Sequence, residues 1–188
     1  MTLPVASCLP LLLLLLAVLT PACIVEAPGG DKPGASGAAA PRPGVKPVTL
    51  KNGANFDGKV ELMAVTFTPG LLVPGDVTQV KLYFRVLAPL GDDWQVFVHA
   101  EDPEGRVARA NYDHLPVSGR RPTSGWRPGE IIEDAFTIGL PLGSHQRAMD
   151  LWVGFWLPRT DARLPVRNAE AVRADNDRVP LARIAAQP

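Results

Sequence analysis

Beyond Val48, the sequence is built of short apolar runs that alternate residue by residue and are separated by Gly and Pro. The run Val77–Leu87 (VTQVKLYFRVL) is the clearest example, with Val80, Leu82 and Phe84 on one face and mostly polar residues on the other. Alternation with period two is the pattern of a β-strand that is buried on one side. This part of the chain therefore predicts an all-β domain.

Seven segments share the strand pattern, and turn residues separate them. They are Val60–Thr68, Val77–Leu87, Trp94–Glu101, Arg106–Tyr112, Ile131–Ile138, Ala148–Trp156 and Arg178–Ile184. Asn168–Ala174 is the best helical candidate, with one or two turns. About seven short strands predict an antiparallel two-sheet sandwich, Ig-like, in which the inner faces of both sheets form the core.

Residues 1–22 predict an export signal. They carry no charged side chain and include six consecutive leucines, Leu11–Leu16. The apolar run is shorter than the roughly 20 residues that a transmembrane helix needs, because Pro10 and Pro21 bound it. The chain is therefore expected to be exported.

The segment Leu19-Thr20-Pro21-Ala22-Cys23 resembles a bacterial lipobox, in which the cysteine becomes a lipid-modified N-terminus. The lipobox pattern prefers leucine where Thr20 stands, and proline at the next position is unusual. Ordinary cleavage after Ala22 or Ala27 is the alternative. Lipidation of Cys23 would anchor the protein in a membrane, and Ile24 after the cysteine favours the outer membrane or cell surface over the inner membrane.

Cysteine usage supports the lipidation hypothesis. Cys8 and Cys23 are the only cysteines, and both lie in or beside the signal. The folded part is therefore expected to contain neither a disulfide nor thiol chemistry, although export would permit disulfides.

Residues 23–47 predict a disordered linker. Beyond Ala27 the sequence is dominated by Pro, Gly and Ala and has no aromatic residue to bury. The expected organisation is a signal peptide over 1–22, a lipidated cysteine with its linker over 23–47, and a β-sandwich domain over 48–188.

Charge and motif content argue against several functions. The 19 basic and 19 acidic residues balance and form no long run, so nucleic acid is not an expected partner. The chain lacks GxSxG and SxxK motifs and has no cysteine nucleophile in the domain, which predicts a protein that is not an enzyme and uses no cofactor. A glycosidase needs only two suitably placed carboxylates, so a hydrolase remains the third alternative.

The stretch FVHAEDPEGRVARANYDH, residues 97–114, is rich in histidines and carboxylates. Asp102-Pro103-Glu104-Gly105 has the residues of a type I turn, which predicts a β-hairpin. The only histidines are His99, His114 and His145, without the spacing of a metal motif, so no transition-metal site is expected. Loop carboxylates leave a structural calcium ion open as an alternative.

Two features are candidates for ligand binding. The first is a loop in which Arg120, Arg121 and Arg127 flank Trp126. The alternative is that Trp126 plugs one end of the sandwich while the arginines are solvated.

The second feature is the strand DLWVGFW, in which Trp152 and Trp156 lie on one face with Gly154 between them. If exposed, this face would form a flat aromatic platform suited to sugar rings. The alternative is a strand buried on both faces, in which Gly154 makes room for a neighbour.

The order of the motifs LYFRVLAPLGDDWQVFVHAEDPEGRVARANYD, LPVSGRRPTSGWRPGEIIEDAFTIGLP, MDLWVGFW and DRVPLARI resembles a known module over about Val60–Ile184. It is similar to the soluble β-sandwich found C-terminal to bacterial mannosyltransferase-like membrane glycosyltransferases and as stand-alone exported lipoproteins. The resemblance implies an extracytoplasmic sandwich near envelope glycans. It does not imply transferase activity, because in that family the chemistry lies in membrane helices.

Together these patterns predict a lipid-anchored, non-enzymatic β-sandwich that binds envelope polysaccharide or a glycan-handling partner, with Trp126, Arg120, Arg121, Trp152 and Trp156 as candidate contacts. A structural or protein-interaction lipoprotein of a surface assembly is the alternative.

Overall fold

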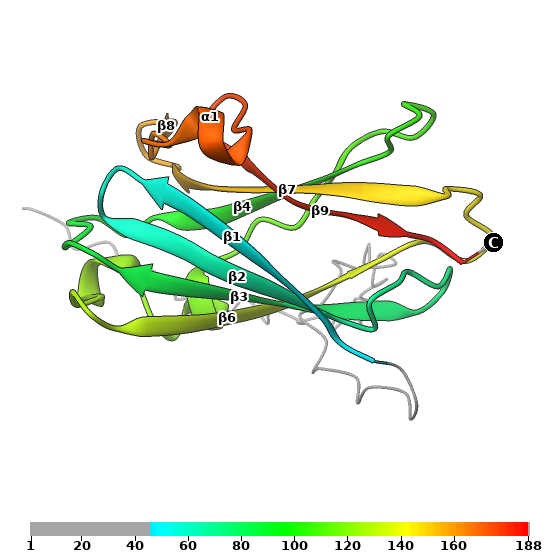
Figure 1. The fold of residues 1–188 in the computed structure, drawn as a ribbon, viewed down its shortest axis with the longest axis horizontal. Coiled ribbons are helices and arrows are strands. Elements are labelled where there is room, and N and C mark those ends of the chain that lie inside the picture. Colours follow the sequence, from blue (N-terminus) through cyan, green and yellow to red (C-terminus); the bar gives the residue numbers. More distant parts are fainter. Residues whose placement is uncertain (1–45, 188) are drawn as a thin grey trace, which may run out of the picture. The chain divides into compact units, whose positions relative to one another are not determined.

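The structure is a computed structural model that describes residues 46–187, and it consists of two antiparallel β-sheets packed face to face (Figure 1). The first sheet has the order β1-β2-β3-β6, with β1 at Val48–Phe56, β2 at Val60–Thr68, β3 at Val77–Val86 and β6 at Ile131–Gly139. The predicted all-β antiparallel sandwich is confirmed.

The second sheet is centred on β7, which spans Ala148–Leu157. On one side β7 pairs with β4, and β4 pairs with β5; β8 and β9 also pair with β7. The ranges are β4 Gln95–Glu101, β5 Ala110–Asn111, β8 Ala162–Arg163 and β9 Val179–Ala185. Short helices occupy the connections: η1 Pro116–Gly119, η2 Thr123–Gly125 and α1 Ala169–Val172.

The core lies between the sheets and follows the alternation of the sequence. On β3, Val80, Leu82 and Phe84 are buried, as predicted for one face of a half-buried strand. The Phe155 ring, from β7, lies 5.2 Å from that of Phe84, so aromatic side chains of both sheets interdigitate. The sandwich is held by burial of these inner faces.

β1 is a strand that the alternation did not predict. Its sequence VTLKNGANF contains Asn and Gly, which are depleted in strands. The pairing of β1 with β2 shifts between Lys51 and Ala54, so a bulge interrupts the alternation around Asn52-Gly53. β1 pairs on one side only, as an edge strand, and therefore tolerates these residues.

The predicted turn at Asp102–Gly105 forms, but the hairpin around it is looser than expected. The Gly105 N–H donates to the Asp102 carbonyl at 2.9 Å, and the Asp102 carboxylate accepts the N–H groups of Glu104 and Arg106 at 3.1 and 2.9 Å. Burial opposes ionisation of Asp102, but these hydrogen bonds outweigh it and lower the pKa. The outgoing strand, predicted over 106–112, is reduced to Ala110–Asn111.

The predicted export signal, the lipidation site Cys23 and most of the linker lie outside the described residues. Within residues 46–187, no helix is long and apolar enough to cross a membrane. The helical candidate Asn168–Ala174 contains α1, a single turn.

Candidate functional site

Trp126 belongs to the core and is not a surface contact. Its side chain is 2% exposed and packs against Phe84 and Phe155, with ring centroids 6.0 and 6.3 Å away. Its indole N–H donates to the carbonyl of Arg121 at 2.9 Å. Every part of the indole therefore has an internal partner, and the structure leaves no ring face for a ligand.

The arginines of the same loop point outward. Arg120 and Arg121 are both exposed, and the Arg121 guanidinium forms an ion pair with Glu130 at 2.9 Å. This arrangement matches the alternative reading of the loop, in which the tryptophan plugs the sandwich and the arginines are solvated.

Trp152 and Trp156 share the outer face of β7, opposite the buried Leu151, Val153 and Phe155. The gap over Gly154 is not open surface. A Cβ at Gly154 would lie 2.4 Å from Cζ of Phe97 and 2.7 Å from the carbonyl oxygen of Asp177. Gly154 therefore makes room for the Phe97 ring, which separates the two tryptophans.

Two arginines cover the aromatic rings of this outer face. The Arg178 guanidinium lies over Trp152 at 4.5 Å from the ring centroid, and Arg163 lies over Phe97 at 4.7 Å. Arg178 is held in place by ion pairs with Glu101 and with Asp175, the latter at 3.0 Å. The predicted flat platform is thus replaced by a stack of rings and guanidinium groups.

Trp156 is the ring of the pair that no arginine covers. It is half-buried, and its indole N–H donates to the Asp161 carboxylate at 2.9 Å. The hydrogen bond fixes the ring orientation, and neither cation–π contact of the outer face involves this ring. Of the tryptophans predicted as contacts, Trp156 is thus the one that is neither buried in the core nor covered by a guanidinium group.

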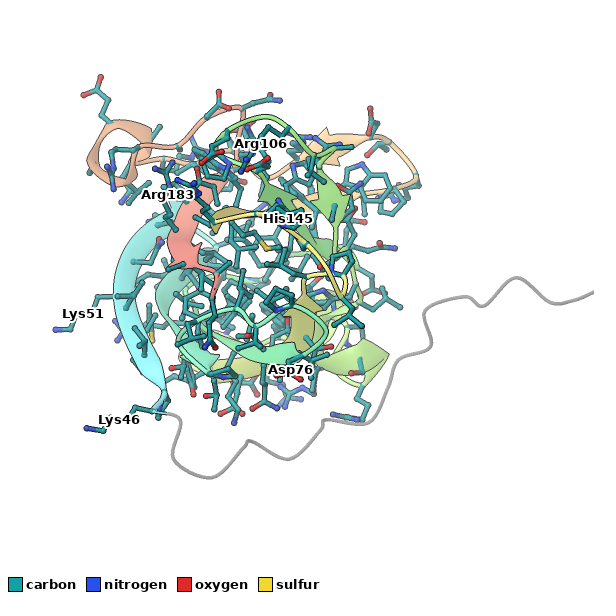
Figure 2. The ribbon with its side chains drawn as sticks, turned by 90° about the vertical axis from the view of Figure 1, so that its right-hand side faces the viewer. Lys46, Lys51, Asp76, Arg106, His145 and Arg183 are labelled. Carbon is teal, nitrogen blue, oxygen red and sulfur yellow. The ribbon has the colours of Figure 1, made fainter. Side chains whose placement is uncertain are left out.

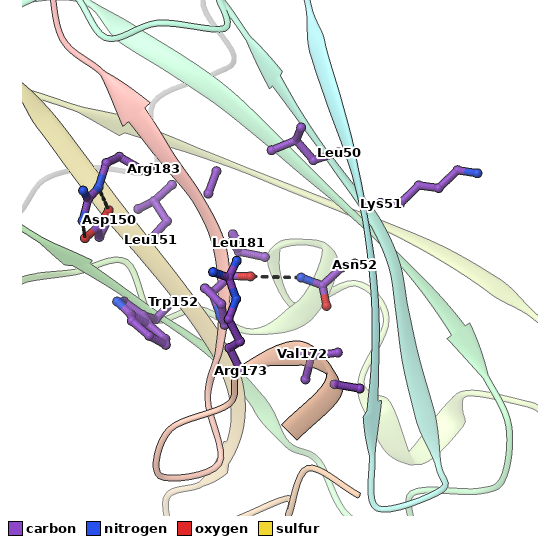
Figure 3. A pocket seen from close by; sticks show the side chains of 13 residues that line it. Leu50, Lys51, Asn52, Asp150, Leu151, Trp152, Val172, Arg173, Leu181 and Arg183 are labelled. Atoms are coloured by element: carbon purple, nitrogen blue, oxygen red, sulfur yellow. Dashed lines mark hydrogen bonds and ion pairs between the residues drawn. The ribbon is translucent and has the colours of Figure 1, made fainter. Parts of the chain in front are cut away.

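A cleft of about 700 Å³ opens between the edge strands β1 and β9, with α1 at one end (Figure 3). We call it the β1–β9 groove. Figure 3 shows Asp150, Arg183 and Trp152 on one side of β9 and Leu50 and Asn52 on the other. Its lining residues are Leu50, Lys51, Asn52, Asp150, Leu151, Trp152, Ala171, Val172, Arg173, Pro180, Leu181, Ala182 and Arg183.

The polar groups of the groove are fixed in place by hydrogen bonds. Asp150 and Arg183 form a two-point pair, with both N···O distances 2.6 Å. Asn52 donates to the carbonyl of Pro180 at 3.0 Å and accepts from the N–H of Ala54 at 3.1 Å, which ties β1 to β9. The groove therefore offers pre-oriented donors and acceptors beside an indole ring, which can hydrogen-bond to a polar molecule.

The cations of the groove differ in their partners. Arg173 is exposed and has no ion pair among the described residues, and in Figure 3 its side chain runs from the end of α1 along β9. Lys51 points away from the groove in the same view. Arg173 is therefore the unneutralised cation of the groove itself.

A second polar cluster lies apart from the groove. Asp134, 0% exposed on β6, accepts from His114 Nε2 at 2.8 Å and from the Val117 N–H at 2.7 Å, while His114 Nδ1 lies 2.7 Å from the carbonyl oxygen of Tyr112. Burial favours a neutral ring, but the hydrogen bond to Asp134 and its charge outweigh this and raise the pKa of His114. Both ring nitrogens face acceptors, so this pair stabilises a loop and leaves no free nitrogen to act as a base.

Among residues 46–187, no group of three or more His, Cys, Asp or Glu side chains is placed to hold a metal ion. Of the five predicted contacts, Trp152 lines the groove, while Trp126, Trp156, Arg120 and Arg121 lie elsewhere. Asn52, Asp150, Arg173 and Arg183 were not predicted. They come from four separate elements, and no local motif connects them.

No protein-family model matches the chain, and no curated protein matches it. Among solved structures, the chain is similar to the crystal structure of the C-terminal domain of wzt, at 16% sequence identity and a TM-score of 0.36. The similarity covers 78% of this chain and 80% of that chain. The two-sheet sandwich is defined by the strand pairing of this chain itself.

Proposed function

We propose that this protein is a lipid-anchored, non-enzymatic β-sandwich of a bacterial envelope, whose β1–β9 groove binds envelope polysaccharide. The single observation that carries the binding role is the groove, where the fixed Asp150–Arg183 pair lies beside Trp152. The export-signal pattern, the lipobox-like segment ending in Cys23 and the resemblance to a glycosyltransferase-associated module support the envelope location.

Polysaccharide is the ligand that this composition fits best. Sugar hydroxyl groups are paired donors and acceptors, which planar carboxylate and guanidinium groups recognise at two points. The C–H faces of sugar rings pack on aromatic rings, and Trp152 supplies such a ring in the lining of the groove. A cleft that is open at a sheet edge also admits an internal unit of a polymer.

The binding role is tested with the full-length protein, purified in detergent, against a panel of bacterial envelope polysaccharides. Arg183→Ala removes the guanidinium group of the Asp150–Arg183 pair. Because Arg183 is exposed, the fold is expected to survive. Binding is expected to weaken about tenfold, because one charge-assisted hydrogen bond to the ligand is lost. Arg121→Ala, in the Trp126 loop, is the matched control and should bind as the unaltered protein does.

Saturable binding that is lost in Arg183→Ala and kept in Arg121→Ala supports the groove. Equal loss in both variants would indicate a non-specific charge effect, and no binding by the folded protein would remove polysaccharide of that panel from the proposal. Lipidation is checked separately: mass spectrometry of the mature protein should find acyl chains on Cys23, and Cys23→Ser should leave the membrane fraction.

An apolar end of the molecule favours a second candidate, a protein-interaction role in a surface assembly. Leu142 is 87% exposed, Val77 48% and Leu71 38%. The loop before β3 lies against the loop after β6, because a Cβ at Gly75 would lie only 3.0 Å from Cδ1 of Leu142. Figure 2 faces this end, where Asp76 and His145 also lie.

This second role is tested by a photo-crosslinking residue at position 142 in living cells. A defined protein adduct from position 142, absent from a probe at the exposed Ile131, would support it. No adduct specific to position 142 would leave polysaccharide binding as the better account.

A further inference from the structure

We infer that the β1–β9 groove selects acidic polysaccharide, and that Arg173 is the residue that contacts its carboxylate groups. This inference rests on the proposed polysaccharide-binding function and adds the chemical class of the ligand. It is carried by the charge of the groove and by the position of the Arg173 side chain.

The lining of the groove has excess positive charge. Lys51 points away from the groove, so two cations, Arg173 and Arg183, face one carboxylate, Asp150, which leaves a formal charge of +1. Asp150 is already bound at two points by Arg183. An entering anion would therefore meet a cation without displacing an internal partner.

Arg173 has a backbone conformation that is unusual for arginine. It caps α1 in the left-handed region, at φ 54° and ψ 44°, and its N–H donates to the carbonyl of Glu170 at 3.3 Å. Glycine is the common residue at this helix-capping position, because a Cβ is disfavoured there. Replacing Arg173 by glycine would therefore remove the side chain without straining the backbone.

The side chain of Arg173 is positioned to contact a carboxylate group of the ligand. It extends along β9 within the groove (Figure 3), while the Asp150–Arg183 pair and Asn52 lie on either side of that strand. A guanidinium group offers two parallel N–H donors that match a carboxylate. A uronic acid unit would place its carboxylate on Arg173 and its hydroxyl groups near the fixed polar groups.

Arg173→Gly is the decisive variant, because it separates binding from folding. Glycine relieves the left-handed conformation, so thermal stability is expected to stay the same or to rise. Binding of the full-length protein to alginate, a polymer of uronic acids, is expected to weaken about tenfold or more. Binding to dextran, a neutral polymer, is expected to be weaker than to alginate and insensitive to this change.

Arg120→Ala is the matched control, since Arg120 is an exposed arginine of the Trp126 loop, remote in sequence from the groove. It should bind alginate within about twofold of the unaltered protein, at low and at physiological ionic strength. An equal loss in Arg120→Ala and Arg173→Gly would overturn the inference, because general charge attraction would then explain the binding.

If dextran and alginate bind equally, Arg183→Ala weakens both and Arg173→Gly weakens neither, the polysaccharide site stands and its acidic selectivity is wrong. If neither polymer nor any of the envelope panel binds, both are overturned. Stronger alginate binding that depends on Arg173 and not on Arg120 supports the inference.

Discussion

Gly154 lies where the outer face of β7 meets the Phe97 ring and the backbone of the segment before β9. Gly154→Ala would place its Cβ 2.7 Å from the Asp177 carbonyl oxygen, a backbone atom that cannot rotate away. We expect a loss of roughly 1–3 kcal/mol in unfolding free energy, the usual cost of overpacking. Denaturant unfolding measures it.

Gly125 provides the control for this prediction. A Cβ there meets no atom within 4 Å and the residue is exposed, so Gly125→Ala should change the unfolding free energy by less than about 0.5 kcal/mol. If the two alanine variants unfold at the same denaturant concentration, the close approach over Gly154 is not present in solution.

Trp126 shows what a sequence pattern cannot decide. The Pro- and Gly-punctuated loop was predictable, but whether its tryptophan points in or out depends on the gap between Phe84 and Phe155, on strands distant in sequence. The environment of Trp152 is equally hidden from the sequence, because Arg178, which covers its ring, is distant from it in the chain. Burial of a loop side chain is set by tertiary packing.

Trp126→Ala is expected to cost roughly 3–5 kcal/mol, the range for truncating a large buried aromatic residue. Arg120→Ala, in the same loop but solvated, should stay within about 0.5 kcal/mol. Thermal and denaturant unfolding of both variants measure the difference. A stable Trp126→Ala protein would show that the loop does not carry part of the core.

Strands with clean alternation were predictable because the sandwich buries one of their faces. β2 begins and ends where the sequence placed it, at Val60 and Thr68, and β3 and β6 each end within one residue of the predicted end. The edge strand β1 was not predictable, because its bulge at Asn52-Gly53 breaks the period and its stability comes from pairing with β2. The groove depends on β1, so it could not be predicted either.

The edge strands β1 and β9 are linked by the Asn52 side chain, which donates a hydrogen bond to the Pro180 carbonyl. Asn52→Ala removes the hydrogen bond to the Pro180 carbonyl and should lower the unfolding free energy by about 1 kcal/mol. Hydrogen exchange should speed up along β9 more than along β3. Asn111→Ala, exposed on β5, is the control, and equal exchange in the two variants would contradict a bridge between the sheet edges.

Across the whole molecule, two histidines make stability depend on pH in opposite directions. His99 is buried, and burial, together with the charges of nearby arginines such as Arg109, lowers its pKa below the ordinary value of 6.5. Arg178 lies 3.4 Å from its Nδ1, which suits a neutral ring. The pKa of His114 is raised above 6.5 through its hydrogen bond to Asp134.

These shifts predict a stability maximum near pH 6.5. The folded protein holds the His114 proton more tightly than the unfolded chain does, so this contribution is full below pH 6.5 and is lost as the pH rises through the raised pKa. The folded protein resists protonation of His99, so that contribution is full above pH 6.5 and is lost as the pH falls through the lowered pKa.

Denaturant unfolding between about pH 5 and pH 9 tests the two limbs separately, in the range where histidines with shifted pKa values titrate. His114→Gln should flatten the alkaline limb and leave the acid limb, and His99→Gln should do the reverse. The slope of unfolding free energy against pH is the readout, so a general loss of stability in either variant does not obscure the result. An alkaline slope that survives in His114→Gln would mean that another group titrates there, and that the His114–Asp134 pair does not hold its proton through folding.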